Sequence, residues 1–219
     1  MFARVMRLTK LEHAALIIEQ NGETLIIDPG SFTRPMTDVE SVVAVVITHE
    51  HADHWTAEQL TGILAGNAGA RLLGPAGVVA ATAAAGITAE QVDAGDTVTV
   101  GSFTLRFFGG RHAVIHESIP VVDNVGVLVN DRFYYAGDSF TIPDGVEVDT
   151  LAAPAGAPWM KVAETMDYAV AIGAKNVFPT HEMVLSRAGK DLSNGRLTWA
   201  AEQGGGTFHA LEPGDTLDI

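Results

Sequence analysis

The sequence of 219 residues contains no cysteine. Disulfide bonds, thiolate metal sites and cysteine nucleophiles are therefore excluded, and any metal ion must be held by histidine and carboxylate side chains. Basic residues are also scarce, because 13 Lys and Arg stand against 27 Asp and Glu and give a formal net charge of -14. A surface with this charge repels phosphate backbones, so we expect no nucleic acid held in a basic groove.

Long apolar runs are absent as well. No stretch approaches the roughly 18 apolar residues that a membrane-spanning helix needs, so we expect no membrane insertion. The first ten residues carry Arg4, Arg7 and Lys10 and lack an apolar segment of signal-peptide length, which indicates a cytoplasmic protein. The hydrophobic content of 47% can fill one core, and no linker divides the chain, so residues 1–219 are expected to form a single domain.

Three histidines and an aspartate follow an apolar run within six positions. The run at residues 42–47 is β-branched and uncharged, which predicts a buried strand that ends in a loop. In an extended chain, residues i and i+2 point the same way, so His49 and His51 can bind one metal ion. Asp53 and His54 lie beyond a bend and can face a second ion close by.

Turn signals and periodicity predict the elements around this cluster. Asn21-Gly22 lies between two apolar stretches and predicts an antiparallel hairpin, and Asn130-Asp131 predicts a second one. Residues 56–59 fit a capping box, so a helix is expected to begin at Thr56. Alternating apolar residues predict a half-buried strand over residues 103–107. Further helices are expected over residues 75–85, 162–170 and 197–203.

Two short segments resemble each other, residues 25–32 (LIIDPGSF) and residues 133–140 (FYYAGDSF). Each follows a predicted hairpin. This similarity indicates two β-rich halves, each with helices on its outer side and with strand ends that meet at one edge. The predicted fold class is therefore α/β, a four-layer αββα sandwich.

Three more predicted strand ends carry a side chain that binds metals. His112, Asp138 and His181 each follow a strand directly or through one or two small or turn-forming residues. Such side chains at neighbouring strand ends are what a metal site at a sheet edge requires. His116 competes with His112 as a ligand, and we favour His112 because it lies nearer the strand end. His13, before the first hairpin, is interpreted as structural or as the support of a ligand.

The complete motif series resembles that of the metallo-β-lactamase superfamily. The matching residues are His49-x-His51-x-Asp53-His54, a later single histidine, Gly137-Asp138-Ser139 and Pro179-Thr180-His181. The resemblance implies the αββα fold and two divalent metal ions. One ion is then bound by His49, His51 and His112, and the other by Asp53, His54 and His181, with Asp138 between them. Zinc suits histidine and carboxylate ligands best, although this set also accepts manganese or iron.

The first thirty residues narrow the resemblance. His13-Ala14-Ala15, the hairpin and Asp28-Pro29 are similar to small cytoplasmic metal-dependent hydrolases related to ascorbate-6-phosphate lactonase, although Glu12 replaces the usual glycine. Asp28 matches a family aspartate that stabilises the loops near the metals rather than binding them.

The predicted function is hydrolysis of a small-molecule ester, lactone or phosphodiester by a metal-bound hydroxide. Asp53 is expected to bind a metal ion and to orient the nucleophile, while His116 or water protonates the leaving group. Trp159 and Lys161 precede a predicted helix and are expected to line the mouth of the site. The alternatives are a non-catalytic or regulatory metal-binding protein of the same fold, or a thioester hydrolase. An exposed sheet edge is compatible with a homo-oligomer.

Overall fold

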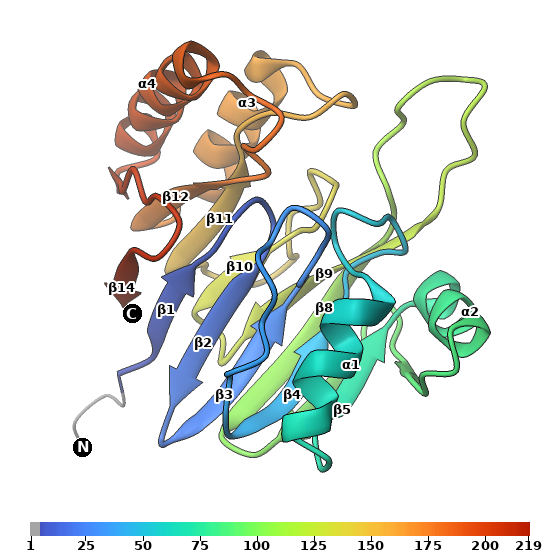
Figure 1. Ribbon diagram of the computed structural model, residues 1–219. Coiled ribbons are helices and arrows are strands. Elements are labelled where there is room, and N and C mark those ends of the chain that lie inside the picture. The colour runs from blue at the N-terminus through green and yellow to red at the C-terminus, as the bar shows by residue number, and fades with distance from the viewer. Residues whose placement is uncertain (1–4) are drawn as a thin grey trace.

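Two seven-stranded β-sheets pack face to face in the computed structural model, which describes residues 5–219 (Figure 1). The first sheet consists, in spatial order, of β14 (Thr216–Asp218), β1 (Arg7–Lys10), β2 (Leu16–Gln20), β3 (Glu23–Ile27), β4 (Val42–Val46), β5 (Arg71–Gly74) and β6 (Glu90–Gln91). The second consists of β13 (Thr207–Phe208), β12 (Asn176–Thr180), β11 (Thr150–Pro154), β10 (Phe133–Tyr135), β9 (Asp123–Val129), β8 (Phe103–Arg111) and β7 (Thr97–Val100).

Helices cover the outer faces of both sheets (Figure 1). α1 (Ala57–Gly66) and α2 (Ala76–Ala84) lie on the first sheet, and α3 (Val162–Ile172) and α4 (Arg187–Gln203) lie on the second. This arrangement confirms the predicted four-layer αββα sandwich. Within residues 5–219, none of the helices is both long enough and apolar enough to cross a membrane.

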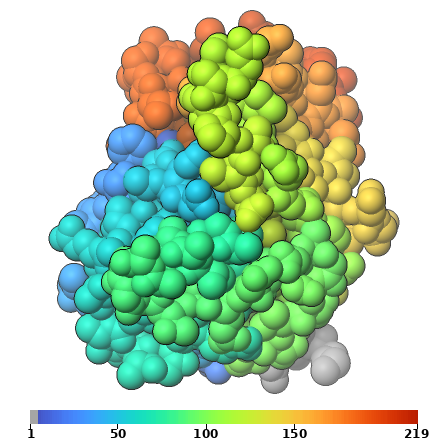
Figure 2. Space-filling model, turned by 90° about the vertical axis from the view of Figure 1, so that its right-hand side faces the viewer, coloured from blue at the N-terminus to red at the C-terminus, as the bar shows by residue number. Residues whose placement is uncertain are grey.

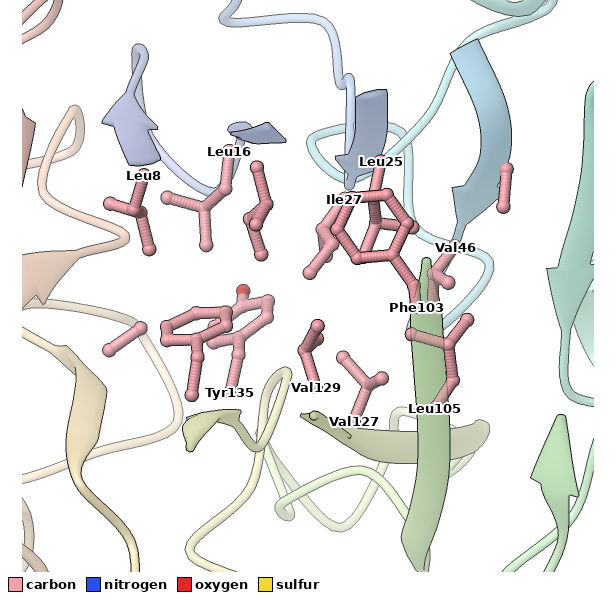
Figure 3. Close-up of a cluster of buried hydrophobic side chains, with 14 of the residues drawn as sticks. Leu8, Leu16, Leu25, Ile27, Val46, Phe103, Leu105, Val127, Val129 and Tyr135 are labelled. Carbon is pink, nitrogen blue, oxygen red and sulfur yellow. The ribbon is translucent and has the colours of Figure 1, made fainter. Parts of the chain in front are cut away.

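The main core fills the space between the two sheets. Leu8, Leu16 and Ile27 of the first sheet point toward Val127 and Tyr135 of the second, and each of these side chains is almost wholly removed from solvent (Figure 3). Burying one large apolar side chain stabilises a fold by about 1.5–3 kcal/mol. The alternation of apolar residues along these strands therefore fixes which face of each sheet turns inward.

The two sheets have the same pairing pattern. In the first, β1, β2 and β3 pair antiparallel and β3 to β6 pair parallel. In the second, β8, β9 and β10 pair antiparallel and β10 to β13 pair parallel. The similar segments LIIDPGSF and FYYAGDSF begin on the equivalent strands β3 and β10. They therefore place Asp28 and Asp138 at corresponding strand ends.

Both predicted hairpins are present. The turn residues Asn21 and Gly22 have φ values of 54° and 77°, and Asn130 and Asp131 have values of 51° and 52°. Two consecutive residues with positive φ form the type I′ turn, whose twist matches that of the strands. The Asn-Gly and Asn-Asp signals were therefore sufficient for these turns.

Two local predictions differ from the structure. α4 begins at Arg187 rather than near residue 197, because the Ser186 hydroxyl accepts the Gly189 N–H and caps a helix whose first half contains two weak helix formers, Gly189 and Gly195. At α1, the Thr56 hydroxyl accepts the Gln59 N–H at 3.2 Å, as a capping box requires. The Gln59 side chain instead binds backbone groups of residues 33–36, so only half of the box forms.

Candidate metal centre

The candidate ligands gather at one edge of the sandwich, the upper edge in Figure 1. The loop after β4 carries the histidine cluster, and His112, Asp138 and His181 follow β8, β10 and β12. Among the described residues, three overlapping groups have ligand atoms within 4.8 Å of one another. These groups are His49, His51 and His112; His13, Asp53, His54 and His181; and His49, His54 and Asp138. All the residues predicted as ligands thus lie together, and His13 joins them.

Four histidines in the site share one hydrogen-bond arrangement. Their Nδ1 atoms face an acceptor at 2.5–3.1 Å: the Thr48 hydroxyl for His49, Asp28 for His54, the Ala113 carbonyl for His112 and the Gly156 carbonyl for His181. Their Nε2 atoms are buried and make no hydrogen bond of ordinary geometry. When Nδ1 donates, a neutral imidazole has a bare lone pair on Nε2, which is what metal binding requires.

These Nε2 atoms surround the carboxylate of Asp138. The Nε2 atom of His54 lies 3.2 Å from Oδ1, and those of His112 and His181 lie 3.3 Å and 3.1 Å from Oδ2. Ligands bound tetrahedrally at about 2.0–2.1 Å from zinc are about 3.3 Å from one another. The donor types and their spacing therefore fit a divalent metal ion.

The carboxylates and imidazoles of the site shift one another's pKa values. Burial alone would raise the pKa of Asp138, but His54 and His181 hold it well below its ordinary range. Burial opposes the charged form of His181, yet the Asp138 carboxylate raises the pKa of His181 to about 9. Without a metal ion, the proton of His181 that balances this carboxylate sits on Nε2, the position that a metal ion would take.

Metal affinity is accordingly expected to rise with pH. The pKa of His181 is raised from 6.5 to about 9, so its charged form stabilises the metal-free fold fully below pH 6.5, and this stabilisation is lost as the pH passes 9. A metal ion binds only the deprotonated ring, so affinity should increase about tenfold per pH unit between pH 7 and 9 for each proton released. Calorimetry in buffers of different ionisation enthalpy measures this release. A flat affinity with no proton released at pH 7 would contradict the expectation.

Two buried polar side chains hold the ligand loops. Asp28 accepts hydrogen bonds from the Thr48 N–H at 2.8 Å, the Thr48 hydroxyl at 2.6 Å and His54 Nδ1 at 2.7 Å. Its position agrees with the loop-stabilising role that the resemblance implied. Asn124 accepts the Asp138 N–H at 3.0 Å and donates to the Ala136 carbonyl at 2.9 Å. The sequence did not single out Asn124, because nothing local links it to the Gly137-Asp138 turn.

The residues predicted to line the mouth of the site or to protonate the leaving group differ in their exposure to solvent. Trp159 is buried, and its indole Nε1–H donates to Asp138 Oδ2 at 2.7 Å, so it supports a candidate ligand rather than lining an open mouth. Lys161 is exposed at the start of α3. His116 is also exposed, and its Nδ1 lies 2.7 Å from the Ser118 hydroxyl. The structure therefore places His112, and not His116, beside His49 and His51.

Close packing against Gly30 fixes the position of the loop that carries Asp53 and His54. A Cβ atom at this position would lie 1.8 Å from the Asp53 carbonyl oxygen and 2.6 Å from the His54 amide nitrogen. Gly30→Ala is therefore expected to displace Asp53 and His54, and a displacement of 1 Å costs about 100-fold in rate. Metal content and kcat/KM measure the effect. Gly66→Ala is the control, because a Cβ atom there meets nothing within 4 Å; equal values for both variants would contradict this role.

Comparison with known proteins identifies the family. Residues 7–181 match the model of the beta-lactamase superfamily domain. The chain is 35% identical over 198 residues to Protein Rv0786c of Mycobacterium tuberculosis, and the aligned residues cover 88% of this chain and 92% of that protein. It is 32% identical over 157 residues to a UPF0173 metal-dependent hydrolase of Aeropyrum pernix, which covers 61% of each. The chain therefore belongs to the metallo-β-lactamase superfamily.

A solved structure supports the fold. Igni18, a metallo hydrolase from Ignicoccus hospitalis, superimposes with a TM-score of 0.74 over 98% of both chains, at 17% sequence identity. At this identity the similarity concerns the fold alone. The fold is thus shared over 98% of this chain.

Proposed function

We propose that this protein is a metal-dependent hydrolase that cleaves a small-molecule ester, lactone or phosphodiester. The observation that carries the proposal is the set of buried histidine Nε2 atoms that lie around Asp138 and make no hydrogen bond of ordinary geometry. The names of the Aeropyrum pernix and Ignicoccus hospitalis proteins, a metal-dependent hydrolase and a metallo hydrolase, agree with it. Zinc suits these donors best, and manganese or iron are the alternatives to be tested.

The residues present fit two ions. His49, His51 and His112 would hold one, and Asp53, His54 and His181 the other, with Asp138 between them. When bound, such ions lower the pKa of a coordinated water and polarise the oxygen of the substrate. The chain's own contribution is to fix the ligands: Asp28 orients His54, and Trp159 and Asn124 hold Asp138.

The open side of the site lies at Asp53 and His51. These are the only predicted ligands that are not buried, and the Asp53 side chain keeps 27% of its surface exposed. Substrate would therefore approach past Asp53, whose carboxylate would orient the attacking water by accepting its hydrogen bond. We expect bulk water or His116, an exposed residue of the loop of residues 112–122, to protonate the leaving group.

The loop of residues 112–122 suits the apolar part of a substrate. It closes at its base through the His112 N–H and the Val122 carbonyl, and Val114 and Ile119 are 63% and 42% exposed on it. In Figure 2 this lime-coloured loop rises at the top of the molecule, beside the blue-to-cyan residues of the first half. We therefore expect esters and lactones with an apolar acyl group to be better substrates than small hydrophilic ones.

Metal analysis followed by a substrate screen tests the function. We expect two divalent ions per chain and chelator-sensitive turnover of at least one class among esters, lactones and phosphodiesters. Turnover of thioesters alone would favour a thioester hydrolase. Two bound ions without turnover of any class would favour a regulatory metal-binding protein.

The role of Asp53 has its own test. Asp53→Ala should lower kcat at least about 100-fold, because it removes a metal ligand, and loss of even a residue that supports a ligand costs 10–100-fold. Glu58→Ala, at an exposed position on the adjacent helix α1, is the control. Asp53→Ala protein that retains both ions and hydrolyses substrate at the normal rate would remove this role.

A further inference from the structure

We infer that His13 is a positioning residue that holds the Asp53 carboxylate in place for the second metal ion without binding that ion itself. The inference rests on the proposed two-metal site. By distance alone His13 is a candidate ligand, because its ring nitrogen lies within 4.8 Å of the ligand atoms of Asp53, His54 and His181. Its hydrogen bonds distinguish the two roles.

The contacts of His13 determine which ring nitrogen carries the proton. The backbone N–H of Met183 donates to Nδ1 at 3.3 Å, so Nδ1 presents its lone pair. A neutral imidazole then carries its proton on Nε2. Nε2 lies 3.2 Å from Asp53 Oδ2, so its N–H donates to that oxygen.

This arrangement is the reverse of that in the candidate ligands. In His54 and His181, Nδ1 donates to Asp28 and to the Gly156 carbonyl, which leaves Nε2 for a metal ion. In His13, Nε2 is the donor, and a nitrogen that carries a proton has no lone pair for a metal. His13 therefore contacts the second metal site through Asp53.

The surroundings of His13 prevent its ring from turning over. The side chain is fully buried, its ring centroid lies 3.9 Å from that of His181, and the Phe32 ring packs against it at 4.8 Å. The His13 carbonyl also accepts the His181 N–H at 2.9 Å.

A buried ion pair also links the end of β1 to the loop after β12. Lys10 Nζ lies 2.7 Å from Glu182 Oε1, and both side chains are almost wholly buried. The segment that leads from β1 to β2 is therefore attached to the loop after β12 at Lys10 and again at His13. This makes the Nε2–H a fixed donor.

Asp53 needs such a donor more than the other candidate ligands of the second ion do. Its side chain is partly exposed, whereas His54, Asp138 and His181 are buried. A carboxylate at the surface of a loop is free to rotate into water unless a hydrogen bond holds one oxygen. Residues that hold a metal ligand in this way contribute 10–100-fold to metal affinity.

Two replacements at His13 test the inference by metal binding rather than by activity. In titrations with cobalt followed by its visible spectrum, His13→Ala should bind the first ion normally and the second about 10–100-fold more weakly. His13→Gln should largely restore the second site, because its amide N–H can replace Nε2–H. Both variants share the backbone φ of 60° at this position, so any strain is common to them. His209→Ala, whose ring contacts Asn176 and not the site, is the control.

Equal second-ion affinity in His13→Ala and the unchanged protein would overturn the inference, and so would equal losses in His13→Ala and His13→Gln. Nitrogen NMR of the zinc-loaded natural protein gives a test that needs no variant. The His13 ring should keep its proton on Nε2, whereas a deprotonated Nε2 bound to zinc would make His13 a ligand and overturn the inference. If the natural protein binds no second ion at all, the proposed function itself fails.

Discussion

Replacing Asp138 with alanine is expected to release both metal ions and to lower hydrolysis at least about 100-fold, the upper effect of losing a residue that merely supports a ligand. The Asp138 carboxylate lies 3.1–3.3 Å from the Nε2 atoms of His54, His112 and His181, which belong to both halves of the site. No other described carboxylate lies close to candidate ligands of both ions. Metal analysis after dialysis and kcat/KM give the two readouts.

Asp144→Ala is the matched control for this variant. Asp144 is an exposed aspartate a few residues further along the same loop, so it reports the effect of removing one negative charge. It should retain both ions and full activity. An Asp138→Ala protein that keeps two tightly bound ions, or that hydrolyses substrate normally, would show that Asp138 does not bridge the site.

Replacing Asp28 with alanine is expected to destabilise the fold by about 3–5 kcal/mol, the usual effect of removing one partner of a buried ion pair. The partner is His54: burial lowers the pKa of its ring, but the carboxylates of Asp138 and Asp28 raise it well above its ordinary value, so the ring is charged in the metal-free protein. Asp28 is wholly buried and accepts three hydrogen bonds, two from Thr48 and one from His54. Its loss leaves these donors unsatisfied. Metal affinity should fall about 10–100-fold as well, because His54 loses the group that orients its ring.

Urea unfolding of the metal-free protein measures the stability, and metal titration measures the affinity. Asp28→Asn separates the effect of losing the negative charge from the effect of losing the side chain. Asparagine keeps an acceptor oxygen and tolerates the φ of 47° at this position. We expect it to be more stable than Asp28→Ala. An Asp28→Ala protein with an unchanged urea midpoint would mean that the ligand loops are held by other contacts.

Local signals were sufficient for much of the fold. The Asn21-Gly22 and Asn130-Asp131 turns each specify a hairpin within a few residues, and the apolar run at 42–47 identifies the strand that leads to His49. The internal similarity was also informative, since β3 and β10 occupy equivalent places in the two sheets. These features depend on neighbours in the sequence, which is why they could be predicted.

The supporting contacts of the site could not be predicted in this way. His13 contacts Asp53, 40 residues away, and Met183, 170 residues away. Trp159 donates a hydrogen bond to Asp138, which is 21 residues away in the sequence. The sequence pattern predicts that Trp159 lines the mouth of the site and does not predict this contact. Each depends on which side chains the two sheets bring to one edge. The sequence favoured His112 over His116 as a ligand, but only the course of the loop of residues 112–122 places His112 beside His49 and His51.

Two groups of side chains at one edge of the sandwich are expected to bind two divalent ions. Anomalous diffraction from crystals of the metal-loaded protein tests it most directly. We expect two peaks, each about 2.0–2.2 Å from its ligand atoms: one beside His49, His51 and His112, the other beside Asp53, His54 and His181, with Asp138 between them. Fully loaded crystals with no peak at these residues, or with metal only elsewhere on the chain, would contradict it.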